Sequence, residues 1–430
     1  ATADVRLDGS NAWDKAGTGA AALGDVNADG VDDLVVGAVY YPGSGSSGGG
    51  FLALGPVTTS TDLESLDATY LGEGGVGQAF AGAGDVNGDG FDDILIGADS
   101  YSSSAGAAYL LYGPATTSLT LSSADASFYG GATLSYVGWS LSTAGDVDGD
   151  GNDDILIGAP EIHINPTYTG GYAADAGAVY LFHGPVSGVT DLAYADAKLE
   201  GEGTTYYSGR SVDGAGDLNG DGVQDVVVGA SGYRTGGRSI GAAYVVYGPV
   251  SGTQSLALAD ALIEGSGTSA AMGNKLHVLG DANGDAYDDL LVSYGAGAYL
   301  FLGPISGTLS VSASDYQASF STNCSDSAYG AIGAPGDVNQ DGFADVILGD
   351  QCDDTNGTDA GAGYLYYGQL EGSYGPSDAD ATMLGEVAGD RAGVTVGAAG
   401  DVDNDGYPDI YMGAPWAEPN GELSVAVYLF

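Results

Sequence analysis

Positively charged residues are scarce in this chain of 430 residues. It has 8 lysines and arginines against 58 aspartates and glutamates, which gives a formal net charge of −50 at pH 7. Proteins bind nucleic acid by neutralising phosphates with cationic side chains, so this composition excludes a nucleic-acid-binding function. The negative surface potential of a membrane would also repel the chain.

Long apolar runs and catalytic signatures are missing as well. No stretch of 18 consecutive apolar residues occurs, so we expect no membrane insertion. No cationic segment followed by an apolar stretch marks a leader, so any export signal would lie outside this sequence. The chain has 3 histidines and no GxSxG, HExxH, P-loop or CxxC motif. We therefore expect that it is not an enzyme.

What the chain contains instead is one acidic phrase of nine residues that occurs seven times. The copies lie at 25–33, 85–93, 146–154, 217–225, 281–289, 337–345 and 401–409. Each is followed by an apolar run such as LVVGA or ILIGA, which is typical of a β-strand. From 25 to 401 is 376 residues over six intervals, a mean of about 63. Repetition at such a period indicates a solenoid, a propeller or an array.

Each repeat predicts four short strands. The acidic loop lies between the first two, and an alternating apolar and aromatic segment that often ends on Gly-Pro, such as GAAYLLYGP at 106–114, is the third. A segment with an Ala-Asp-Ala phrase leads into the fourth. No segment shows a helical period. A four-stranded sheet repeated around an axis is the blade of a propeller.

The two ends of the chain belong to the same predicted blade. Residues 3–9 (ADVRLDG) match the fourth-strand segment 259–265, and residues 425–430 (VAVYLF) match the third-strand segment 177–182. The predicted fold class is therefore all-β: a seven-bladed β-propeller of four-stranded antiparallel blades, closed by the N-terminal strand, which completes the last blade. Such pairing removes exposed strand edges. We expect residues 1–430 to form this one domain as a monomer.

Oxygen-bearing residues alternate along each acidic loop in a pattern that favours Ca²⁺. The ion takes six to eight oxygen ligands, and a short loop with side-chain oxygens at positions 1, 3, 5 and 9 and a backbone carbonyl at position 7 can surround it. The predicted ligands are Asp25, Asn27, Asp29, Val31, Asp33; Asp85, Asn87, Asp89, Phe91, Asp93; Asp146, Asp148, Asp150, Asn152, Asp154; Asp217, Asn219, Asp221, Val223, Asp225; Asp281, Asn283, Asp285, Tyr287, Asp289; Asp337, Asn339, Asp341, Phe343, Asp345; and Asp401, Asp403, Asp405, Tyr407, Asp409. We expect up to seven Ca²⁺.

The loop at Asp281 differs from the others at position 6. There Ala286 replaces the glycine that permits a sharp turn. If this position needs a positive φ, alanine costs about 1–2 kcal/mol, so this site should be the weakest. An EF-hand is excluded because position 12 is apolar in every copy and a β-run follows instead of a helix.

The phrase AGDVNGDGFDDILIGA at 83–98, followed by GAAYLLYG at 106–113, resembles the FG-GAP repeat of integrin α-subunit propellers. The resemblance covers all seven units and includes Gly-Ala-Pro at 158–160 and 413–415. It implies calcium loops on the lower face and a ligand face built from the loops between strands 4 and 1 and between strands 2 and 3. A free-standing propeller resembles bacterial FG-GAP proteins more than an animal receptor.

The propeller frame places the two cysteines on that ligand face. Cys324 precedes the first strand of one blade and Cys352 lies between its second and third strands. We predict a disulfide between them, which is typical of an oxidising compartment, and hence a secreted or cell-surface protein.

Aromatic and cationic residues in the same loops are the candidate ligand contacts. Tyrosine and tryptophan offer large contact areas with few rotatable bonds, and they also stack on sugar rings. The candidates are Tyr41, Tyr101, Tyr136, Tyr168, Tyr207, Tyr233, Arg234 and Trp416. The alternative is that these tyrosines pack between loops.

The sequence thus predicts a calcium-binding, calcium-stabilised extracellular propeller that acts as a ligand-binding or adhesion module. Its partner would be a protein or a glycan, bound through the face opposite the calcium loops. Two alternatives stay open: a purely structural module of a larger surface protein, and a carbohydrate-active enzyme.

Overall fold

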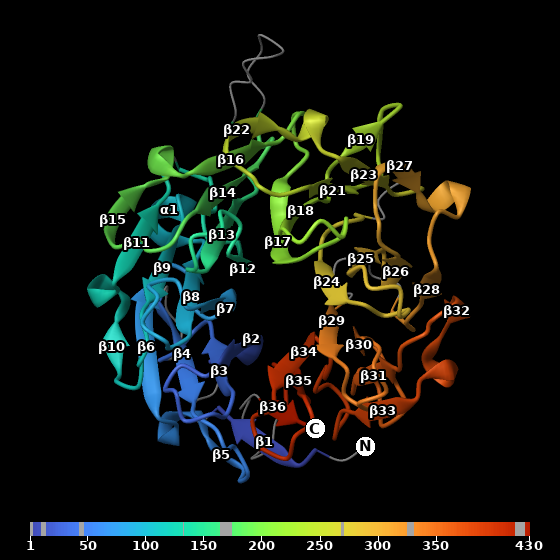
Figure 1. The fold of residues 1–430 in the computed structure, drawn as a ribbon. Helices are drawn as coiled ribbons and strands as arrows, with labels where there is room; N and C mark the ends of the chain where they lie inside the picture. Colours follow the sequence, from blue (N-terminus) through green and yellow to red (C-terminus); the bar gives the residue numbers. More distant parts are fainter. Residues whose placement is uncertain are drawn as a thin grey trace.

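The computed structural model describes residues 3–9, 14–42, 47–131, 133–163, 174–267, 271–324, 331–417 and 426–430. Seven sheets are arranged around a central axis as the blades of a propeller (Figure 1). The predicted seven-bladed β-propeller is confirmed.

The first strand of each blade lies next to the axis, and these seven strands contact one another in a ring. They are β2 (Ala16–Gly24), β7 (Phe80–Gly84), β12 (Ser140–Gly145), β17 (Ser208–Gly216), β24 (Leu276–Gly280), β29 (Ala331–Gly336) and β34 (Thr395–Gly400). The second strands are β3 (Asp33–Ala38), β8 (Asp93–Ala98), β13 (Asp154–Ala159), β18 (Asp225–Ala230), β25 (Asp289–Tyr294), β30 (Asp345–Asp350) and β35 (Asp409–Ala414). These are the apolar runs that follow the acidic phrases, and most of their residues are buried.

The third and fourth strands complete each antiparallel blade. The third strands are β4 (Ser47–Ala53), β9 (Ala107–Leu111), β14 (Ala178–Phe182), β21 (Ala242–Val246), β26 (Gly297–Phe301), β31 (Ala362–Tyr366) and β36 (Ala426–Leu429). The fourth strands are β6 (Ala68–Glu73), β11 (Ala126–Tyr129), β16 (Ala197–Glu200), β23 (Ala261–Glu264), β28 (Ala318–Phe320), β33 (Ala381–Leu384) and β1 (Val5–Asp8). We number the blades 1 to 7 from β2 to β34.

Ring closure occurs as predicted from the termini. β1 pairs antiparallel with β36, with Val5 opposite Leu429 and Asp8 opposite Ala426. The N-terminal strand therefore completes blade 7, and both ends of the chain lie in this region of the ring (Figure 1).

Six of the seven sheets carry a short fifth strand that the sequence did not reveal. These strands run parallel to the fourth strand, and each comes from the segment that follows the third strand of the next blade. They are β5 (Thr61–Asp62), β10 (Leu119–Thr120), β15 (Gly188–Asp191), β22 (Gly252–Ser255), β27 (Gly307–Ser310) and β32 (Gly372–Tyr374). Each is followed by a 3₁₀ turn: Leu63–Ser65, Leu121–Ser123, Leu192–Tyr194, Leu256–Leu258, Val311–Ala313 and Pro376–Asp378.

Little other regular structure occurs in the described residues. A short helical turn, α1 (Tyr101–Ser104), precedes β9, and β19 (Arg234–Thr235) pairs with β20 (Arg238–Ser239) in the loop before β21. The apolar cores lie between neighbouring blades, seven clusters in all.

The glycine of the Gly-Ala phrase lets adjacent blades approach closely. A Cβ on Gly97 of blade 2 would lie 2.2 Å from the carbonyl oxygen of Gly138 in blade 3, and one on Gly229 would lie 2.1 Å from that of Gly273. Real Cβ atoms do not approach backbone oxygens this closely, so glycine is required at this position.

Candidate calcium loops and the opposite face

All seven acidic loops connect a first strand to a second strand, so they lie on one face of the ring, which we call the acidic-loop face. In the first loop the carboxylate of Asp25 accepts hydrogen bonds from the backbone N–H groups of Asp29 (3.0 Å) and Gly30 (2.7 Å). The first aspartate of every other loop accepts the same pair of bonds. Each loop is therefore wrapped around its first carboxylate.

The side-chain oxygens at positions 3 and 5 each accept a hydrogen bond from the backbone N–H group two residues further along the loop. Asn27 Oδ1 accepts the N–H of Asp29 at 2.8 Å, and Asp29 Oδ1 accepts the N–H of Val31 at 3.0 Å. The other six loops repeat these Asx turns. Because each such oxygen has two lone pairs, it can still bind a cation.

The aspartate at position 9 joins the loop to the rest of its blade. Asp33 accepts the N–H of Val26 at 2.9 Å with one oxygen and the N–H of Gly55, beyond the end of β4, at 2.8 Å with the other. Five other blades repeat both bonds. In blade 7 Asp409 keeps the equivalent bond from Val402, but its second bond comes from the N–H of Asp403.

Burial raises the pKa of all seven position-9 carboxyls. The value rises to about 7 for Asp33, Asp93 and Asp409. It rises to about 6 for Asp154, Asp225, Asp289 and Asp345. Other carboxylates of the same loop also raise the pKa of these groups, while the backbone N–H donors lower it. A cation in the loop would offset this repulsion.

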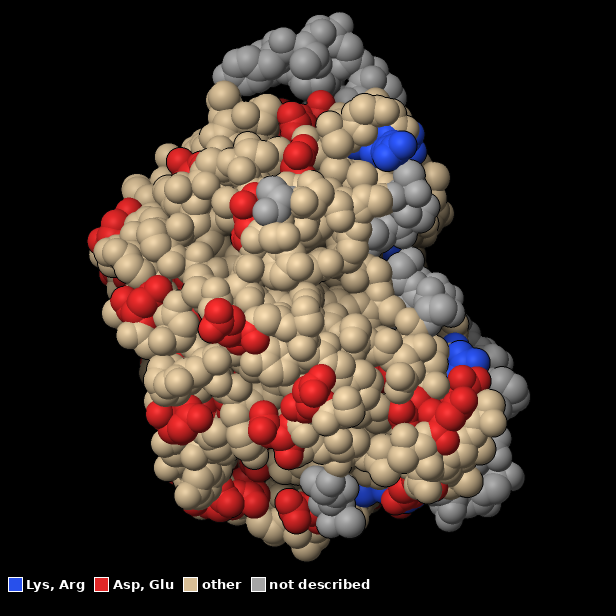
Figure 2. Space-filling model, turned by 90° about the vertical axis from the view of Figure 1, so that its right-hand side faces the viewer, with Lys and Arg blue, Asp and Glu red and all other residues tan. Residues whose placement is uncertain are grey.

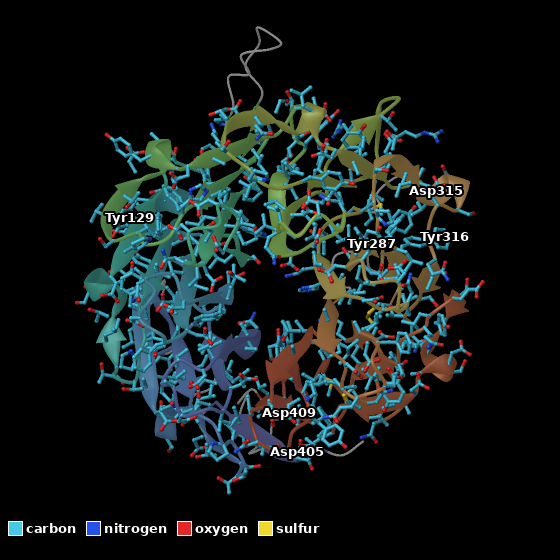
Figure 3. All side chains as sticks on the ribbon, viewed as in Figure 1. Tyr129, Tyr287, Asp315, Tyr316, Asp405 and Asp409 are labelled. Atoms are coloured by element: carbon cyan, nitrogen blue, oxygen red, sulfur yellow. A yellow bond between two sulfur atoms is a disulfide. The ribbon has the colours of Figure 1, made fainter. Side chains whose placement is uncertain are left out.

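In two loops three carboxylates converge, with one oxygen of each within 4.8 Å of the others. The groups are Asp146, Asp148 and Asp154, and Asp401, Asp403 and Asp409. These are the two loops with aspartate at position 3; the other five carry asparagine there. Figure 3 labels Asp405 and Asp409 in the last blade. Converging hard oxygens in a turn that a backbone carbonyl can complete are the donor set that Ca²⁺ prefers, so the residues fit this ion.

Position 6 has a positive φ, as the prediction for Ala286 requires. The φ is +71° at Ala286 and lies between +87° and +95° at the six glycines. The N–H of Ala286 still donates to Asp281 Oδ2 at 2.8 Å, so alanine is held in the same turn. Position 4 also has a positive φ, with non-glycine residues at Ala28, Gln340 and Asn404.

The aspartate at position 8, which the sequence pattern does not distinguish from its neighbours, links adjacent blades. Asp92 of blade 2 accepts the N–H of Asp25 in blade 1 at 2.8 Å. Asp153 and Asp288 do the same for Asp85 and Asp217. Asp32 accepts the N–H of Asp401 at 2.9 Å, which joins the last blade to the first. At the other three junctions position 8 is Gln224, Ala344 or Pro408, and no such bond occurs in the described residues.

Cations gather on the face opposite the acidic loops. Six of the eight lysines and arginines lie at the start of a first strand or in a loop between second and third strands: Lys15, Arg210, Arg234, Arg238, Lys275 and Arg391. Figure 2 shows the ring edge-on, with all visible Lys and Arg atoms on the right-hand half and acidic residues extending to the left-hand edge. The two faces thus differ in charge.

Two of these cations lie at the centre of the ring. A cavity of about 210 Å³ is lined by residues in or directly before the first strands, among them Trp139, Arg210 and Lys275. The guanidinium of Arg210 lies 4.2 Å from the Trp139 ring centroid, and its Nε donates to Asn274 Oδ1 at 3.3 Å. Within the described part of the chain, neither cation has a carboxylate oxygen within 4.0 Å. Lys275 is exposed to the central cavity, but its enclosure by the ring and the nearby Arg210 lower its pKa.

A second group surrounds Trp416. Lys15 Nζ lies 5.1 Å from the Trp416 ring and 5.3 Å from that of Tyr40, and the Arg391 guanidinium lies 5.3 Å from Trp416. Such cation–π contacts hold the cationic heads at the surface.

The predicted ligand candidates fall into three groups. Tyr41, Tyr101, Tyr136 and Tyr233 pack against neighbouring rings at 4.9, 5.6, 5.8 and 5.0 Å, which agrees with the alternative that tyrosines pack between loops. Tyr207 is half-buried before β17, whereas Arg234 is exposed in the β19–β20 hairpin. Tyr168 lies outside the described residues.

Cys324 and Cys352 form the predicted disulfide, with Cα atoms 5.2 Å apart. No described helix is long and apolar enough to cross a membrane.

Comparison with known proteins identifies the kind of repeat from which this propeller is built. A family model described as "FG-GAP repeat" matches residues 76–111, 137–182, 208–246 and 392–428, which are the first three strands of blades 2, 3, 4 and 7. The chain therefore contains FG-GAP repeats within a seven-bladed β-propeller. The acidic phrase itself occurs in all seven blades.

Curated relatives include integrin α subunits. The chain is 31% identical to Integrin alpha pat-2 of Caenorhabditis briggsae over 246 residues, 51% of this chain and 18% of the relative. It is 33% identical to Integrin alpha-5 of Xenopus laevis over 239 residues, 50% of this chain and 20% of the relative. Phosphatidylinositol-glycan-specific phospholipase D of Mus musculus is 35% identical over 148 residues, 32% of this chain and 17% of the relative. The chain spans about a fifth of the length of these relatives.

Proposed function

We propose that this chain is a calcium-binding propeller whose seven acidic loops are each closed by Ca²⁺. The observation that carries the proposal is the repeated loop, in which the first aspartate organises the turn and positions 3 and 5 form Asx turns. In two of the loops the carboxylates of positions 1, 3 and 9 converge. Side chains at positions 1, 3, 5 and 9 and the carbonyl at position 7 would hold the ion. The loop at Asp281 would be the weakest site.

Calcium would act on stability more than on chemistry. Each empty loop holds several carboxylates close together, and burial already disfavours the charged form at position 9. A ligand that binds only the folded chain stabilises it in proportion to the logarithm of its concentration over Kd. In this proposal the ions stabilise the hairpins and have no part in catalysis.

We further propose that the face opposite the acidic loops binds a protein or glycan ligand, so that the chain is an extracellular adhesion module. Six of the eight cations lie there, with Trp139 and Trp416 beside three of them. Partly exposed cations beside aromatic rings suit a ligand with anionic groups. The disulfide and the integrin α relatives support a secreted or cell-surface location.

A binding screen tests the ligand proposal. Acidic glycans and matrix proteins are offered to the calcium-loaded chain, to an Arg210→Ala/Lys275→Ala variant and to Lys198→Ala, which removes a cation paired with Glu200 elsewhere. We expect a ligand that wild type and Lys198→Ala bind and the double variant does not. If no ligand binds, the chain is a structural module. Turnover of an acidic polysaccharide would instead support the carbohydrate-active enzyme.

A further inference from the structure

At the centre of the ring, two adjacent blades carry a cation that the other blades lack. In blades 3, 4 and 7 a serine or threonine near the start of the first strand donates a hydrogen bond to a glycine carbonyl of the next blade, at 2.8–2.9 Å: Ser140 to Gly209, Ser211 to Gly273 and Thr395 to Gly17. Blade 5 has Lys275 at the equivalent position, and blade 4 has Arg210 one residue before Ser211. Both cations are therefore additions to the repeat.

These two residues line the cavity of about 210 Å³ at the ring centre, to which all seven blades contribute. Its described lining contains no aspartate or glutamate, although the chain has 58 of them. Lys275 is exposed, and its Nζ has no hydrogen-bond or ion-pair partner within the described residues; Arg210 is half-buried. A ligand in the cavity would therefore meet both cations.

The guanidinium of Arg210 is held in place with most of its donors unused. It lies 4.2 Å from the centroid of the Trp139 ring, and its Nε donates to Asn274 Oδ1 at 3.3 Å. The charges of Asp99 and Glu161 raise the pKa of Arg210, yet neither carboxylate comes within 4.0 Å of it. In the part of the chain that the structure describes, neither Nη group has an acceptor. The two Nη groups are thus available to a carboxylate.

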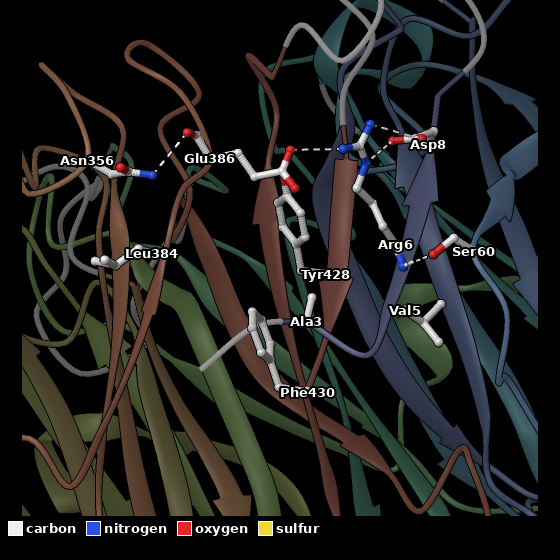
Figure 4. A pocket seen from close by; sticks show the side chains of 10 residues that line it. All are labelled: Ala3, Val5, Arg6, Asp8, Ser60, Asn356, Leu384, Glu386, Tyr428 and Phe430. Atoms are coloured by element: carbon white, nitrogen blue, oxygen red, sulfur yellow. Dashed lines mark hydrogen bonds and ion pairs between the residues drawn. The ribbon is translucent and has the colours of Figure 1, made fainter.

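Arg6 shows how a cation is paired elsewhere in this acidic chain. It lines a groove of about 580 Å³ between blades 6 and 7, where its Nη1 lies 2.9 Å from Glu386 Oε2 and its Nε lies 2.7 Å from Asp8 Oδ1 (Figure 4). At the ring centre, by contrast, one cation faces another, because the charge of Arg210 lowers the pKa of Lys275. An anion bound between them would offset this repulsion.

The rest of the cavity wall favours a sugar acid over an acidic side chain. The cavity is smaller than the volumes of about 300–1,000 Å³ that hold drug-sized ligands, so it accepts one ring or one side chain. Beside the cations it presents the hydroxyl and amide groups of Thr18, Gln78 and Thr395, which come from three other blades. An acidic side chain would leave these groups unused, whereas a uronate carries ring hydroxyls as well as a carboxylate.

We propose that the ring-centre cavity binds one uronate residue of an acidic glycan, with its carboxylate between the guanidinium of Arg210 and the ammonium of Lys275. Arg210 provides two N–H donors to the carboxylate, and Lys275 provides the second positive charge. The ring hydroxyls bind Thr18, Gln78 and Thr395. This inference rests on the ligand proposal above and narrows its ligand from a protein or glycan to one class of sugar.

An NMR titration that reports on the cavity itself tests the proposal. Galacturonate and glucuronate are added separately to the ¹⁵N-labelled full chain, and the indole N–H signal of Trp139 is followed after its assignment with Trp139→Phe. We expect at least one of the two sugars to shift this signal saturably. Its uncharged methyl ester should bind at least about tenfold more weakly, because it cannot form the charge-assisted bonds.

Variants locate the carboxylate. Lys275→Ser restores the residue type that blades 3 and 4 have at this position, so it removes the cation and keeps the strand. This variant and Arg210→Gln should each weaken uronate binding at least about tenfold. Lys198→Ala removes a cation that is paired with Glu200 elsewhere and should leave binding unchanged. Asp99→Asn removes a negative charge that acts on Arg210 and should strengthen binding.

Several results would overturn the proposal: no saturable shift with either uronate, equal affinity for the acid and its ester, or unchanged binding in both Lys275→Ser and Arg210→Gln. Equally tight binding of N-acetylaspartate methylamide would overturn it as well, because an acidic protein segment would then be the occupant. If the uronates fail but the broader screen finds another ligand that requires Arg210 and Lys275, this inference alone fails. If neither experiment finds a ligand, the ligand proposal fails too.

Discussion

Ala286 is the one position-6 residue with a Cβ, and its φ of +71° lies in the left-handed region. This conformation costs an alanine about 1–2 kcal/mol relative to glycine, part of which the greater freedom of glycine in the unfolded chain offsets. We predict that Ala286→Gly stabilises the loop at Asp281 by about 1 kcal/mol, seen as a higher Tm and tighter calcium binding at one site.

Gly30→Ala is the reverse substitution in the loop at Asp25, where a Cβ would meet nothing within 4 Å. It should lower Tm and weaken one calcium site, because only the backbone conformation is penalised. If both substitutions leave Tm and calcium binding unchanged, position 6 does not determine the strength of the site.

The position-8 aspartates provide a test of how blades are joined. Asp92→Ala leaves the N–H of Asp25 without its acceptor at a partly buried junction. The loss should be about 1–2 kcal/mol of unfolding free energy, measured by denaturant titration in excess calcium.

Ala344→Asp is the matched gain-of-contact variant. It places an aspartate where the junction of blades 5 and 6 has none, and where the N–H of Ala344 already donates to the carbonyl of Asp281 at 3.0 Å. It should raise the unfolding free energy. A drop as large as that of Asp92→Ala would show that added charge outweighs the new hydrogen bond.

At the scale of the strand, the disulfide crosses from the segment after β28 to the loop after β30 and closes a loop of sequence separation 28. A cross-link of this span stabilises a fold by about 3 kcal/mol, mainly by restricting the unfolded chain. The Cys324→Ser/Cys352→Ser variant should therefore unfold at lower temperature than the oxidised wild type. Dithiothreitol should lower Tm of the wild type only; an equal effect on both would contradict a structural role.

The elements differ in how visible they are in the sequence. The second strands are apolar runs directly behind the acidic phrase, so local pattern alone locates them. The fifth strands are short, and β15 is largely exposed, so no alternating apolar signal marks them. Their existence depends on the neighbouring blade, which a local pattern does not contain.

In the candidate sites, too, the sequence predicts contacts between residues that are adjacent in the chain but not contacts between blades. The alternating oxygens of the acidic loops are adjacent in sequence, and the turns that the structure shows follow from that spacing. Asp92 has the same residue type as its neighbour Asp93, but its acceptor role involves Asp25, 67 residues away. Arg210 and Lys275 meet at the ring centre only because seven first strands converge there.

On the scale of the whole molecule, the two faces of the ring have opposite roles in the proposed function. One face concentrates the carboxylates of seven loops, and the other carries six of the eight cations. If every loop is filled, seven Ca²⁺ add a charge of +14 and change the net charge from −50 to −36. Stability and ligand recognition are thereby placed on different faces of the ring, so they can be altered separately.

If calcium ions are integral to the fold, the chain should retain them, and counting the retained ions is the sharpest test. The chain is dialysed into calcium-free buffer, and the calcium retained per chain is measured by elemental analysis. We expect six or seven equivalents, with the loop at Asp281 the first to lose its ion. Zero or one equivalent from a chain that keeps its fold would contradict the claim that calcium holds the blades together.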